Sequence, residues 1–522
     1  MQFDIRLNLN KAYRWFSKNG VHAKGYLFDS EENLYRGEEL CTYFSEAKNE
    51  QDFRDKLADA NGVFSVVIER GGSLWLAVDR FRYFPIFYRQ NLQMLRVGDN
   101  PDDLFEPDSR PELDEESCTV FSALTYVLGN KTLLKDVFEL QAGEYAVFEG
   151  QNIRTAFYHK YFAETRNISF EDAKTELKRI IDNMGRRTFR LIDGRPAAVS
   201  LSGGLDSRLV ACILKKSGIK NVVCYTFGVK TGNPELERSE TVARKLGFDW
   251  HFVDYSTIKE SDFYKQKTFL DFCKYTSRYV SKFGFAQYFA CKNLIENKAL
   301  QPGFVHFTGD GGDFFAGSHL RPYMLNYKSI SQIAKDLQYI HCDIAELSGK
   351  ERKLIFNHIL KSLDKRNPLF GNVENWDLKE RQAKYIINTT KLWEFYGLET
   401  QVPLCDKEFA DFFAALPFEY RMNQKLYKTV LHELFEEFDI NFPQDVKTYE
   451  KPFIQQIKKY IKRTFPFLRK KTDLYLYDFL DMKRFLQPVF DEIQKDGSNR
   501  KILSFNGILS EWYLQKMRNE LT

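Results

Sequence analysis

The chain has 522 residues, 43% of them hydrophobic and 28% charged, which is enough apolar surface for the cores of two or three domains. Its formal net charge of +4 is small for this length, so charge alone gives no indication of a nucleic-acid partner. No run of 18 apolar residues occurs, and the first residues, MQFDIRLNLNK, lack the apolar core of a signal peptide. We therefore expect a cytoplasmic protein without a membrane span.

Eight cysteines are scattered along the chain without any CxxC pair. This spacing is typical of buried free thiols in a reducing compartment, and it predicts neither a disulfide framework nor a zinc site. The cysteines are Cys41, Cys118, Cys212, Cys224, Cys273, Cys291, Cys342 and Cys405.

Short β-rich segments separated by turns fill residues 1-160, the predicted first domain. Gly71-Gly72 lies between two of these segments and predicts a β-hairpin. The expected strands lie at 63–68, 74–78, 86–88 and 145–148.

The pattern changes in the predicted second domain, residues 161-522. Ser169 precedes acidic residues and predicts a helix N-cap, and an amphipathic helix is expected to run toward Arg187. A parallel α/β region is expected at about 190–320. Later segments with helical periodicity include 332–347 and 409–416.

The segment Ser202-Gly203-Gly204-Leu205-Asp206-Ser207 joins an expected buried strand at 195–201 to an expected helix that ends near Lys216. The glycines allow backbone N–H groups to approach a phosphate, while the serine hydroxyls and the helix N-terminus add donors and positive charge. Asp206 would repel phosphates, so we expect it to hold a divalent cation that bridges them. The alternative is a tight turn that binds nothing.

This hexapeptide resembles the pyrophosphate-binding loop of enzymes that cleave ATP between its α and β phosphates and activate a substrate as an adenylate. It is neither a Walker A loop nor a GxGxxG fingerprint. A second strand at 221–228, a helix at 235–246 and a third strand at 251–253 are expected next. This alternation predicts a parallel sheet with ligands at its carboxyl edge.

A second glycine-rich segment is Thr308-Gly309-Asp310-Gly311-Gly312-Asp313. Its glycines permit a turn that other residues resist, and the turn brings Asp310 and Asp313 close together. Two carboxylates in one turn indicate that a cation or a proton is shared. A solvated loop without a ligand is the alternative.

Several motifs in order make the chain similar to the asparagine synthetase family, which includes β-lactam synthetase. In the first domain, the similar segments are Asn61-Gly62-Val63-Phe64, Val78-Asp79-Arg80-Phe81, Pro85-Ile86-Phe87-Tyr88 and Leu140-Gln141-Ala142-Gly143-Glu144-Tyr145. In the second domain, they are the two glycine-rich segments, Val402-Pro403-Leu404-Cys405-Asp406, and Pro443-Gln444-Asp445-Val446 leading to Lys451.

The resemblance implies a mixed α/β and α+β protein. The first domain is then a layered, β-rich, Ntn-hydrolase-like glutaminase domain. The second is a parallel-sheet domain of the adenine nucleotide α-hydrolase-like (PP-loop) type with added helices. ATP and Mg²⁺ are the implied cofactors.

The resemblance also implies roles for individual residues. Ser202, Gly203, Gly204, Asp206 and Ser207 would bind pyrophosphate, Gly309 would adjoin the ATP, and Phe227 and Gly228 would line the adenine. Asp206 and Asp313 would hold Mg²⁺.

Asp310 falls at the position of the family's acid/base carboxylate. Lys451, with Lys447 as the alternative, would stabilise charge on the adenylate as the amine attacks. Phe314 stands where the family has Glu, so an altered substrate pocket is expected.

A glutaminase of this family needs a cysteine as its mature first residue, with the free α-amine close to the thiol. Position 2 is Gln, and the first cysteine in the chain is Cys41. We therefore expect a first domain without glutaminase activity that is kept as structure. The nitrogen would come from free ammonia, from ammonia made by a separate glutaminase partner, or from an amine on the substrate.

The predicted function is an ATP-dependent ligase that adenylates a small-molecule carboxylate, releases pyrophosphate and transfers ammonia or an amine, giving an amide plus AMP. Asparagine formation, amidation of a sugar acid and β-lactam-synthetase-like ring closure all remain open. A PP-loop tRNA-modifying enzyme would carry a basic, aromatic-interleaved surface and often paired cysteines, and neither is evident. A non-catalytic scaffold would have no reason to keep Asp206 and Asp313.

Overall fold

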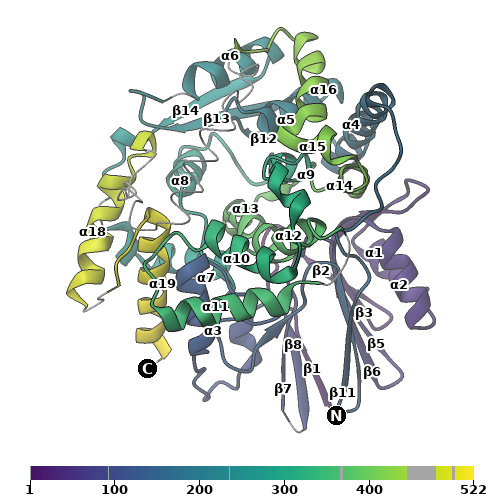
Figure 1. Cartoon of the computed structure of the whole chain (residues 1–522), viewed down its shortest axis with the longest axis vertical. Coiled ribbons are helices and arrows are strands. Elements are labelled where there is room, and N and C mark those ends of the chain that lie inside the picture. The colour runs from purple at the N-terminus through teal and green to yellow at the C-terminus, as the bar shows by residue number, and fades with distance from the viewer. Residues whose placement is uncertain are drawn as a thin grey trace.

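The structure is a computed structural model that describes residues 2–91, 93–233, 235–260, 262–364, 368–443, 478–496 and 500–521. The described part contains two β-sheets formed by residues 2–157 and a third formed by residues 197–401 (Figure 1). Within these described ranges, no helix combines the length and the apolar character that a membrane crossing requires.

Two sheets lie in the first 160 residues. The four-stranded sheet has the order β1 (Gln2–Arg6), β8 (Met94–Gly98), β7 (Phe87–Gln90), β9 (Phe138–Glu139). The seven-stranded sheet has the order β11 (Asn152–Phe157), β10 (Glu144–Glu149), β6 (Ser73–Val78), β5 (Asn61–Arg70), β3 (Val21–Phe28), β2 (Trp15–Lys18), with β4 (Leu34–Arg36) paired to β3. The antiparallel pair β5–β6 confirms the predicted hairpin at Gly71-Gly72.

Strand β6 is buried on both faces, so other layers of the structure pack against both sides of its sheet. Leu74 and Leu76 point into the core that the two sheets share, while Trp75 and Ala77 point to the opposite face. Helices α1 (Glu38–Ser45) and α2 (Glu50–Asp59) cover that opposite face. Residues 2–157 thus form a stack of helices, a large sheet and a small sheet.

The third sheet is parallel throughout, with the order β14 (Asp249–Asp254), β13 (Val222–Gly228), β12 (Ala197–Ser200), β15 (Val305–Phe307), β16 (Glu399–Gln401). Ala197 and Val199 contact one core and Ala198 contacts the other, so both faces are covered. The mixed α/β class with a parallel sheet is therefore confirmed, whereas the domain boundary near residue 160 stays a prediction.

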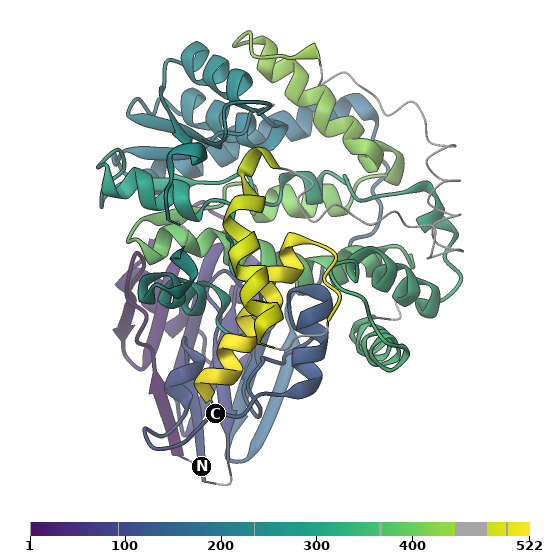
Figure 2. The same cartoon turned by 90° about the vertical axis from the view of Figure 1, so that its left-hand side faces the viewer.

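Helices surround the parallel sheet and extend below it (Figures 1 and 2). They are α3 (Glu115–Leu124), α4 (Phe170–Ile192), α5 (Leu205–Lys216), α6 (Leu236–Leu246), α7 (Lys267–Ser277), α8 (Tyr288–Glu296), α9 (Gly312–Phe315), α10 (Ile330–His341), α11 (Gly349–Ser362), α12 (Gly371–Asp377), α13 (Ile387–Phe395), α14 (Lys407–Ala414), α15 (Phe418–Arg421), α16 (Lys425–Glu436), α18 (Met482–Lys495) and α19 (Phe505–Leu521). The 3₁₀ turns are η1 (Pro101–Leu104), η2 (Tyr255–Thr257), η3 (Phe263–Lys265), η4 (Pro322–Asn326), η6 (Met422–Gln424) and η9 (Asp478–Leu480), and η5 (Leu378–Ile386) is a π-helix.

Most of the predicted elements around the loops are present, and the helix predicted beyond them, at 332–347, ends early. The Ser169 side chain caps α4 by accepting a hydrogen bond from the N–H of Asp172, as expected. The helix predicted at 332–347 ends at His341. Tertiary pairing is the reason, because Ala345 forms an antiparallel bridge with Ile502 and the N–H of Glu346 donates to the carbonyl of Lys501.

Residues of the predicted first domain contact the edge strand of the parallel sheet. The Tyr13 hydroxyl donates to the carbonyl of Thr400 (2.9 Å), and the Tyr26 hydroxyl donates to the side-chain oxygen of Gln401 (2.6 Å). Both acceptors lie in β16, the edge strand, whose backbone would otherwise be open to pairing with another chain. All eight cysteines are free, and all except the half-buried Cys342 are buried, as predicted.

Candidate functional site

The two glycine-rich loops leave adjacent strands at the same edge of the parallel sheet. Strand β12 leads into the loop 202–207, and β15 leads into the loop 308–313. After β12 the chain proceeds to β13 and β14 on one side, whereas β15 and β16 lie on the other. The order therefore reverses between β12 and β15, and such a point is where open α/β sheets bind ligands.

The loop 202–207 is shaped by Gly203 and by two serine hydroxyls. Gly203 has φ of +70°, and a Cβ there would lie 2.8 Å from the Cβ of Arg238. The Ser202 hydroxyl accepts a hydrogen bond from the N–H of Gly204 (3.2 Å) and lies 3.1 Å from the Ser207 hydroxyl. No side chain caps the first turn of α5, so its N–H groups are available to an anion.

Asp206 is where the two loops meet. A Cβ on Gly309 would lie 2.9 Å from the Cβ of Asp206, and one on Gly312 would lie 2.7 Å from its carboxyl carbon. The N–H of Asp313 donates to Oδ2 of Asp206 (2.9 Å), and the Tyr427 hydroxyl donates to Oδ1 (2.7 Å). Glycine is thus required at 309 and 312 by the close approach of the second loop.

The buried carboxyl groups of this site carry shifted pKa values. Burial, followed by the nearby Asp313 carboxylate, raises the pKa of Asp206 to about 7. Burial also raises the pKa of Asp310 to about 6, against a hydrogen bond from the Thr308 hydroxyl to its Oδ2. Both groups therefore take up protons readily unless a cation compensates their charge, and such shifts are typical of functional sites.

The arrangement fits Mg²⁺ bound partly by phosphates. Asp313 is exposed, and its Oδ2 accepts a hydrogen bond from the Ser318 hydroxyl (3.2 Å). In the part of the chain that the structure describes, no three or more His, Cys, Asp and Glu side chains gather as a metal site by themselves. Mg²⁺ in nucleotide sites takes one or two carboxylates and completes its shell with phosphates and water, so Asp206 and Asp313 suit it.

Phe227 and Gly228 lie at the carboxyl end of β13, beside the first loop. Gly228 has φ of +120°, and a Cβ there would lie 2.5 Å from the carbonyl oxygen of Phe479. The Phe227 ring stacks on Tyr255 with centroids 5.5 Å apart. Their contact with adenine stays a prediction.

Lys451 and Lys447, the alternatives for the lysine that stabilises the adenylate, lie outside the described residues.

Phe314 is buried in an aromatic cluster next to Asp313. Its side chain is 3% exposed, and its ring stacks on His319 with centroids 5.1 Å apart. The Nε2 atom of His319 lies 3.4 Å from Oε1 of Glu374, which forms an ion pair with Arg421. Apolar packing thus occupies the position where the family has Glu, and the effect on substrate choice stays a prediction.

Several site residues carry no signal in the sequence. Tyr427 reaches Asp206 from α16, 221 positions away, and it lies in an ordinary amphipathic helix. Ser318 follows the second loop and contacts Asp313, but no motif marks it. Thr308, unlike Tyr427 and Ser318, was part of a predicted motif. Its hydrogen bond to Asp310 could still not be derived from the sequence pattern.

The thiols of the described first domain are not activated. Burial raises the pKa of Cys41 above its usual value, and it raises the pKa of Cys118 to about 12. A nucleophilic cysteine needs a lowered pKa and access to substrate. Neither residue meets this need.

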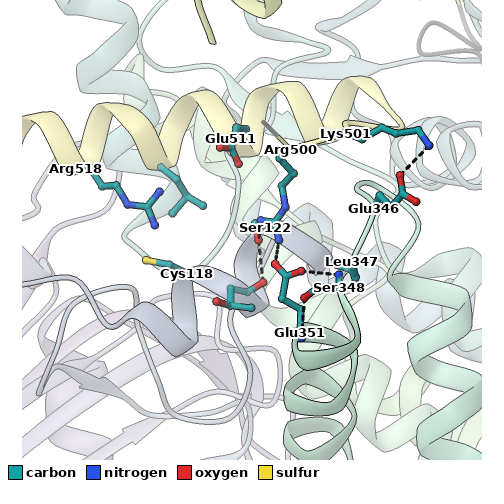
Figure 3. A pocket seen from close by; sticks show the side chains of 12 residues that line it. Cys118, Ser122, Glu346, Leu347, Ser348, Glu351, Arg500, Lys501, Glu511 and Arg518 are labelled. Carbon is teal, nitrogen blue, oxygen red and sulfur yellow. Dashed lines mark hydrogen bonds and ion pairs between the residues drawn. The ribbon is translucent and has the colours of Figure 1, made fainter. Parts of the chain in front are cut away.

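A separate polar pocket of about 660 Å³ lies among α3, α11, α19 and the segment before α19 (Figure 3). Arg500 pairs with Glu351 and also donates to the Ser122 hydroxyl, and Lys501 pairs with Glu346 at 2.8 Å. These charges neutralise each other, and none belongs to the two glycine-rich loops. The pocket therefore lies where helix α3 of the predicted first domain meets residues 500–518.

A parallel sheet with a serine- and glycine-rich loop at its switch point is typical of α/β domains that bind nucleotides. A sequence profile of the asparagine synthase family matches residues 188–451, which are 264 of the 522 residues. The chain therefore belongs to the asparagine synthase family.

Curated relatives are distant. The microcin J25-processing protein McjC of Escherichia coli is 21% identical over 403 residues, covering 74% of this chain and 73% of that protein. Asparagine synthetase B (glutamine-hydrolyzing) of Escherichia coli K12 is 23% identical over 325 residues, covering 58% of this chain and 49% of the enzyme. The chain thus spans about half the length of that synthetase and 42% of the one from Mesocricetus auratus.

Solved structures that match share little sequence. An NH3-dependent NAD synthetase from Campylobacter jejuni is 14% identical, covers 37% of this chain and 95% of its own, and has a TM-score of 0.22. The glutamine phosphoribosylpyrophosphate amidotransferase from B. subtilis is 9% identical, covers 72% and 80%, and has a TM-score of 0.20. Scores of this size do not establish a shared fold.

Proposed function

We propose that the chain is an ATP-dependent carbon–nitrogen ligase that adenylates a carboxylate, releases pyrophosphate and transfers ammonia or an amine, giving an amide plus AMP. The observation that carries this proposal is the contact of the two glycine-rich loops at Asp206. It joins an uncapped helix N-terminus, two serine hydroxyls and three carboxyl groups at one edge of the sheet. Membership of the asparagine synthase family supports the same reaction.

In the first half-reaction, the loop 202–207 binds the departing pyrophosphate. Its N–H groups and the hydroxyls of Ser202 and Ser207 donate to phosphate oxygens, and the α5 N-terminus adds positive charge. The substrate carboxylate attacks the α-phosphorus, and the bond to the β-phosphate oxygen breaks. Asp206 and Asp313 would hold Mg²⁺, which when bound neutralises charge on the pyrophosphate.

In the second half-reaction, the amine nitrogen attacks the acyl carbon and AMP leaves. The nitrogen must lose a proton, and Asp310 is the proposed acceptor. Burial raises the pKa of Asp310 to about 6, which brings it closer to working pH than an ordinary carboxyl group. Lys451 or Lys447 is proposed to stabilise the charge on the adenylate.

The first domain is proposed to be structural, with the nitrogen supplied as ammonia, by a glutaminase partner, or by the substrate itself. The buried thiols Cys41 and Cys118 support this assignment, because both have raised pKa values.

Ring closure within one substrate is the second candidate. The similarity to McjC, which is named for processing microcin J25, extends over 74% of this chain and favours a substrate made by an earlier biosynthetic step. Such a substrate would carry both the carboxylate and the amine. Mass spectrometry separates the candidates, since ring closure removes one water from the substrate without added ammonia.

Substrate-dependent exchange between ATP and labelled pyrophosphate tests adenylation directly. With Mg²⁺ and a broad panel of carboxylates, at least one acid is expected to support exchange. Asp206→Asn is expected to abolish it, while Asp182→Asn on the exposed side of α4 is the matched control. Failure of the whole panel in a folded preparation would favour a scaffold, and tRNA that co-purifies and dissociates steeply with salt would favour the tRNA-modifying alternative.

A further inference from the structure

Helix α16 packs against α5, the helix that follows the loop 202–207 (Figure 1). Its Tyr427 side chain is 0% exposed, and the hydroxyl donates to Oδ1 of Asp206 (2.7 Å). The Tyr427 ring meets Phe409 and Phe413 edge-on, with ring centroids 6.3 Å and 6.1 Å apart. Because these contacts hold the buried ring in one place, its hydroxyl is a fixed donor to the loop.

The Asp206 carboxylate is held at both of its oxygens. Oδ1 accepts the hydrogen bond from Tyr427, and Oδ2 accepts one from the N–H of Asp313 (2.9 Å). The two donors belong to different elements, α16 and the second glycine-rich loop, so rotation of the carboxylate would break at least one bond. Each carboxylate oxygen has about two acceptor sites, so each keeps one for a further ligand. Asp206 is therefore oriented without being saturated.

The partner of Asp206 is a phenol, whereas a nearby buried carboxylate has a cation. Glu374 forms an ion pair with Arg421. Among the residues that the structure describes, no lysine or arginine forms an ion pair with Asp206, and the charge that acts on it most strongly is the like charge of Asp313. A phenol orients a carboxylate without cancelling its charge, which a lysine or arginine would do. The full charge of Asp206 thus stays available to a bound cation.

Arg208 fixes the backbone of the same loop independently of Tyr427. Its Nε donates to the carbonyl of Gly204 (3.2 Å), and its Nη1 donates to the carbonyl of Ile440 (2.9 Å). The guanidinium lies over the ring of Phe435 in α16, 4.5 Å from the centroid. The loop backbone therefore keeps an anchor when the Tyr427 hydroxyl is removed, and only the carboxylate loses a contact.

We propose that Tyr427 is a positioning residue that orients Asp206 for the divalent cation bound with ATP, and that it acts on the cation only through this carboxylate. The inference rests on the proposed ligase function, and it gives α16 a part in nucleotide binding that no motif in the sequence marks. A hydrogen bond from a neighbouring group commonly orients a metal ligand, and its loss weakens metal binding about 10- to 100-fold. Tyr427 should therefore affect the nucleotide only when the cation is present.

Isothermal titration calorimetry tests the inference without turnover. The full chain is titrated with α,β-methylene-ATP, once with Mg²⁺ and once with EDTA, and wild-type protein is expected to bind more tightly with Mg²⁺. Tyr427→Phe keeps the ring and loses only the hydroxyl, so it is expected to weaken binding with Mg²⁺ about 10-fold and to leave binding in EDTA unchanged. Tyr420→Phe is the matched control, because the Tyr420 hydroxyl donates to the carbonyl of Ile168 (3.2 Å) instead of to the loop. It should bind as wild type does under both conditions.

Comparison of the two titrations separates a positioning role from a structural one. The inference is overturned if Tyr427→Phe binds the nucleotide as wild type does, or if it loses the same factor with Mg²⁺ and with EDTA, since a defect in folding would act on both. Equal affinity of wild-type protein with and without Mg²⁺ would also overturn it, because no cation would then depend on Asp206. If folded wild-type protein binds the nucleotide under neither condition, the ligase proposal itself fails, and the inference fails with it.

Discussion

At the scale of single residues, Glu374 shows how a buried charge is kept in place beside the proposed site. Oε2 of Glu374 accepts a hydrogen bond from Arg421 (3.0 Å), and Arg421 also donates to the carbonyl of Phe315 in α9 (3.2 Å). Burial alone would raise the pKa of Glu374, but Arg421 and His319 outweigh it and lower the pKa to about 2. The carboxylate therefore stays ionised and fixes the turn that carries Asp313.

Glu374→Gln is expected to lower the free energy of unfolding by about 3–5 kcal/mol at pH 7, because Arg421 would be left as an unpaired buried charge. The lowered pKa sets the sign of the pH dependence. Wild-type protein has the full stabilisation above the unfolded pKa, about 4.3, and loses it as pH falls toward 2. The difference between variant and wild type should therefore narrow below about pH 4.3.

Urea unfolding at pH 7, 5 and 4 measures this difference, and Glu171→Gln on the exposed face of α4 serves as the control. A difference that does not narrow between pH 5 and pH 4, while both proteins still fold, would contradict the assigned ion pair.

At the scale of elements, the contact between the two glycine-rich loops is the feature that a single substitution should disturb most. Gly312→Ala would place a Cβ 2.7 Å from the carboxyl carbon of Asp206 and 2.7 Å from a methyl of Leu404, so one of these groups must move. We expect pyrophosphate exchange to fall more than about tenfold, since an active-site shift of this size misplaces reacting groups. Circular dichroism should remain that of wild type.

Gly349→Ala is the matched control for that change. Gly349 begins α11, and a Cβ there would have no atom within 4 Å. Alanine is a better helix former than glycine, so the control should keep its activity and its stability. Equal activity of Gly312→Ala and Gly349→Ala would show that the loops need not touch for function.

The elements around the two loops show which parts of the structure could be predicted from the sequence. The run β12, α5, β13, α6, β14 was predictable because strand and helix periods differ and glycine marks each turn. The π-helix η5 was not, since its sequence has an ordinary helical pattern and its extra residue is selected by tertiary packing. Likewise Tyr427 reaches Asp206 only through the packing of a distant helix, which leaves no local signature.

At the scale of the whole molecule, buried charges connect the first domain to the helices below the parallel sheet. Arg82 forms an ion pair with Glu139, Lys384 lies 3.6 Å from Glu139, and Lys384 pairs with Glu380 at 2.7 Å. All four side chains are 0% exposed or nearly so. We expect the network to couple the two parts into one cooperative unit, because either part alone would expose half of it to water.

Lys384→Met should therefore cost about 3–5 kcal/mol, as Glu139 and Glu380 would lose a buried cation between them. Exposed Lys335→Met on α10 should change stability by less than about 0.5 kcal/mol. Urea unfolding followed by fluorescence and by circular dichroism reports both values and shows whether the two probes coincide. Coincident transitions with a loss below about 1 kcal/mol would mean that the network does not hold the domains together.

At the scale of the whole molecule, the source of the nitrogen in the amide depends on whether the predicted first domain can release ammonia from glutamine. The described thiols of the first domain are buried, and burial raises the pKa of both Cys41 and Cys118, so neither is a nucleophile for glutamine. Glutamine alone is therefore expected to support no amide formation, whereas ammonium or a substrate amine should support it. The assay measures AMP, amide and glutamate with each donor, in wild type and in Cys41→Ser. Release of glutamate from glutamine at a rate matched to ligation, and its loss in Cys41→Ser, would instead identify an active glutaminase.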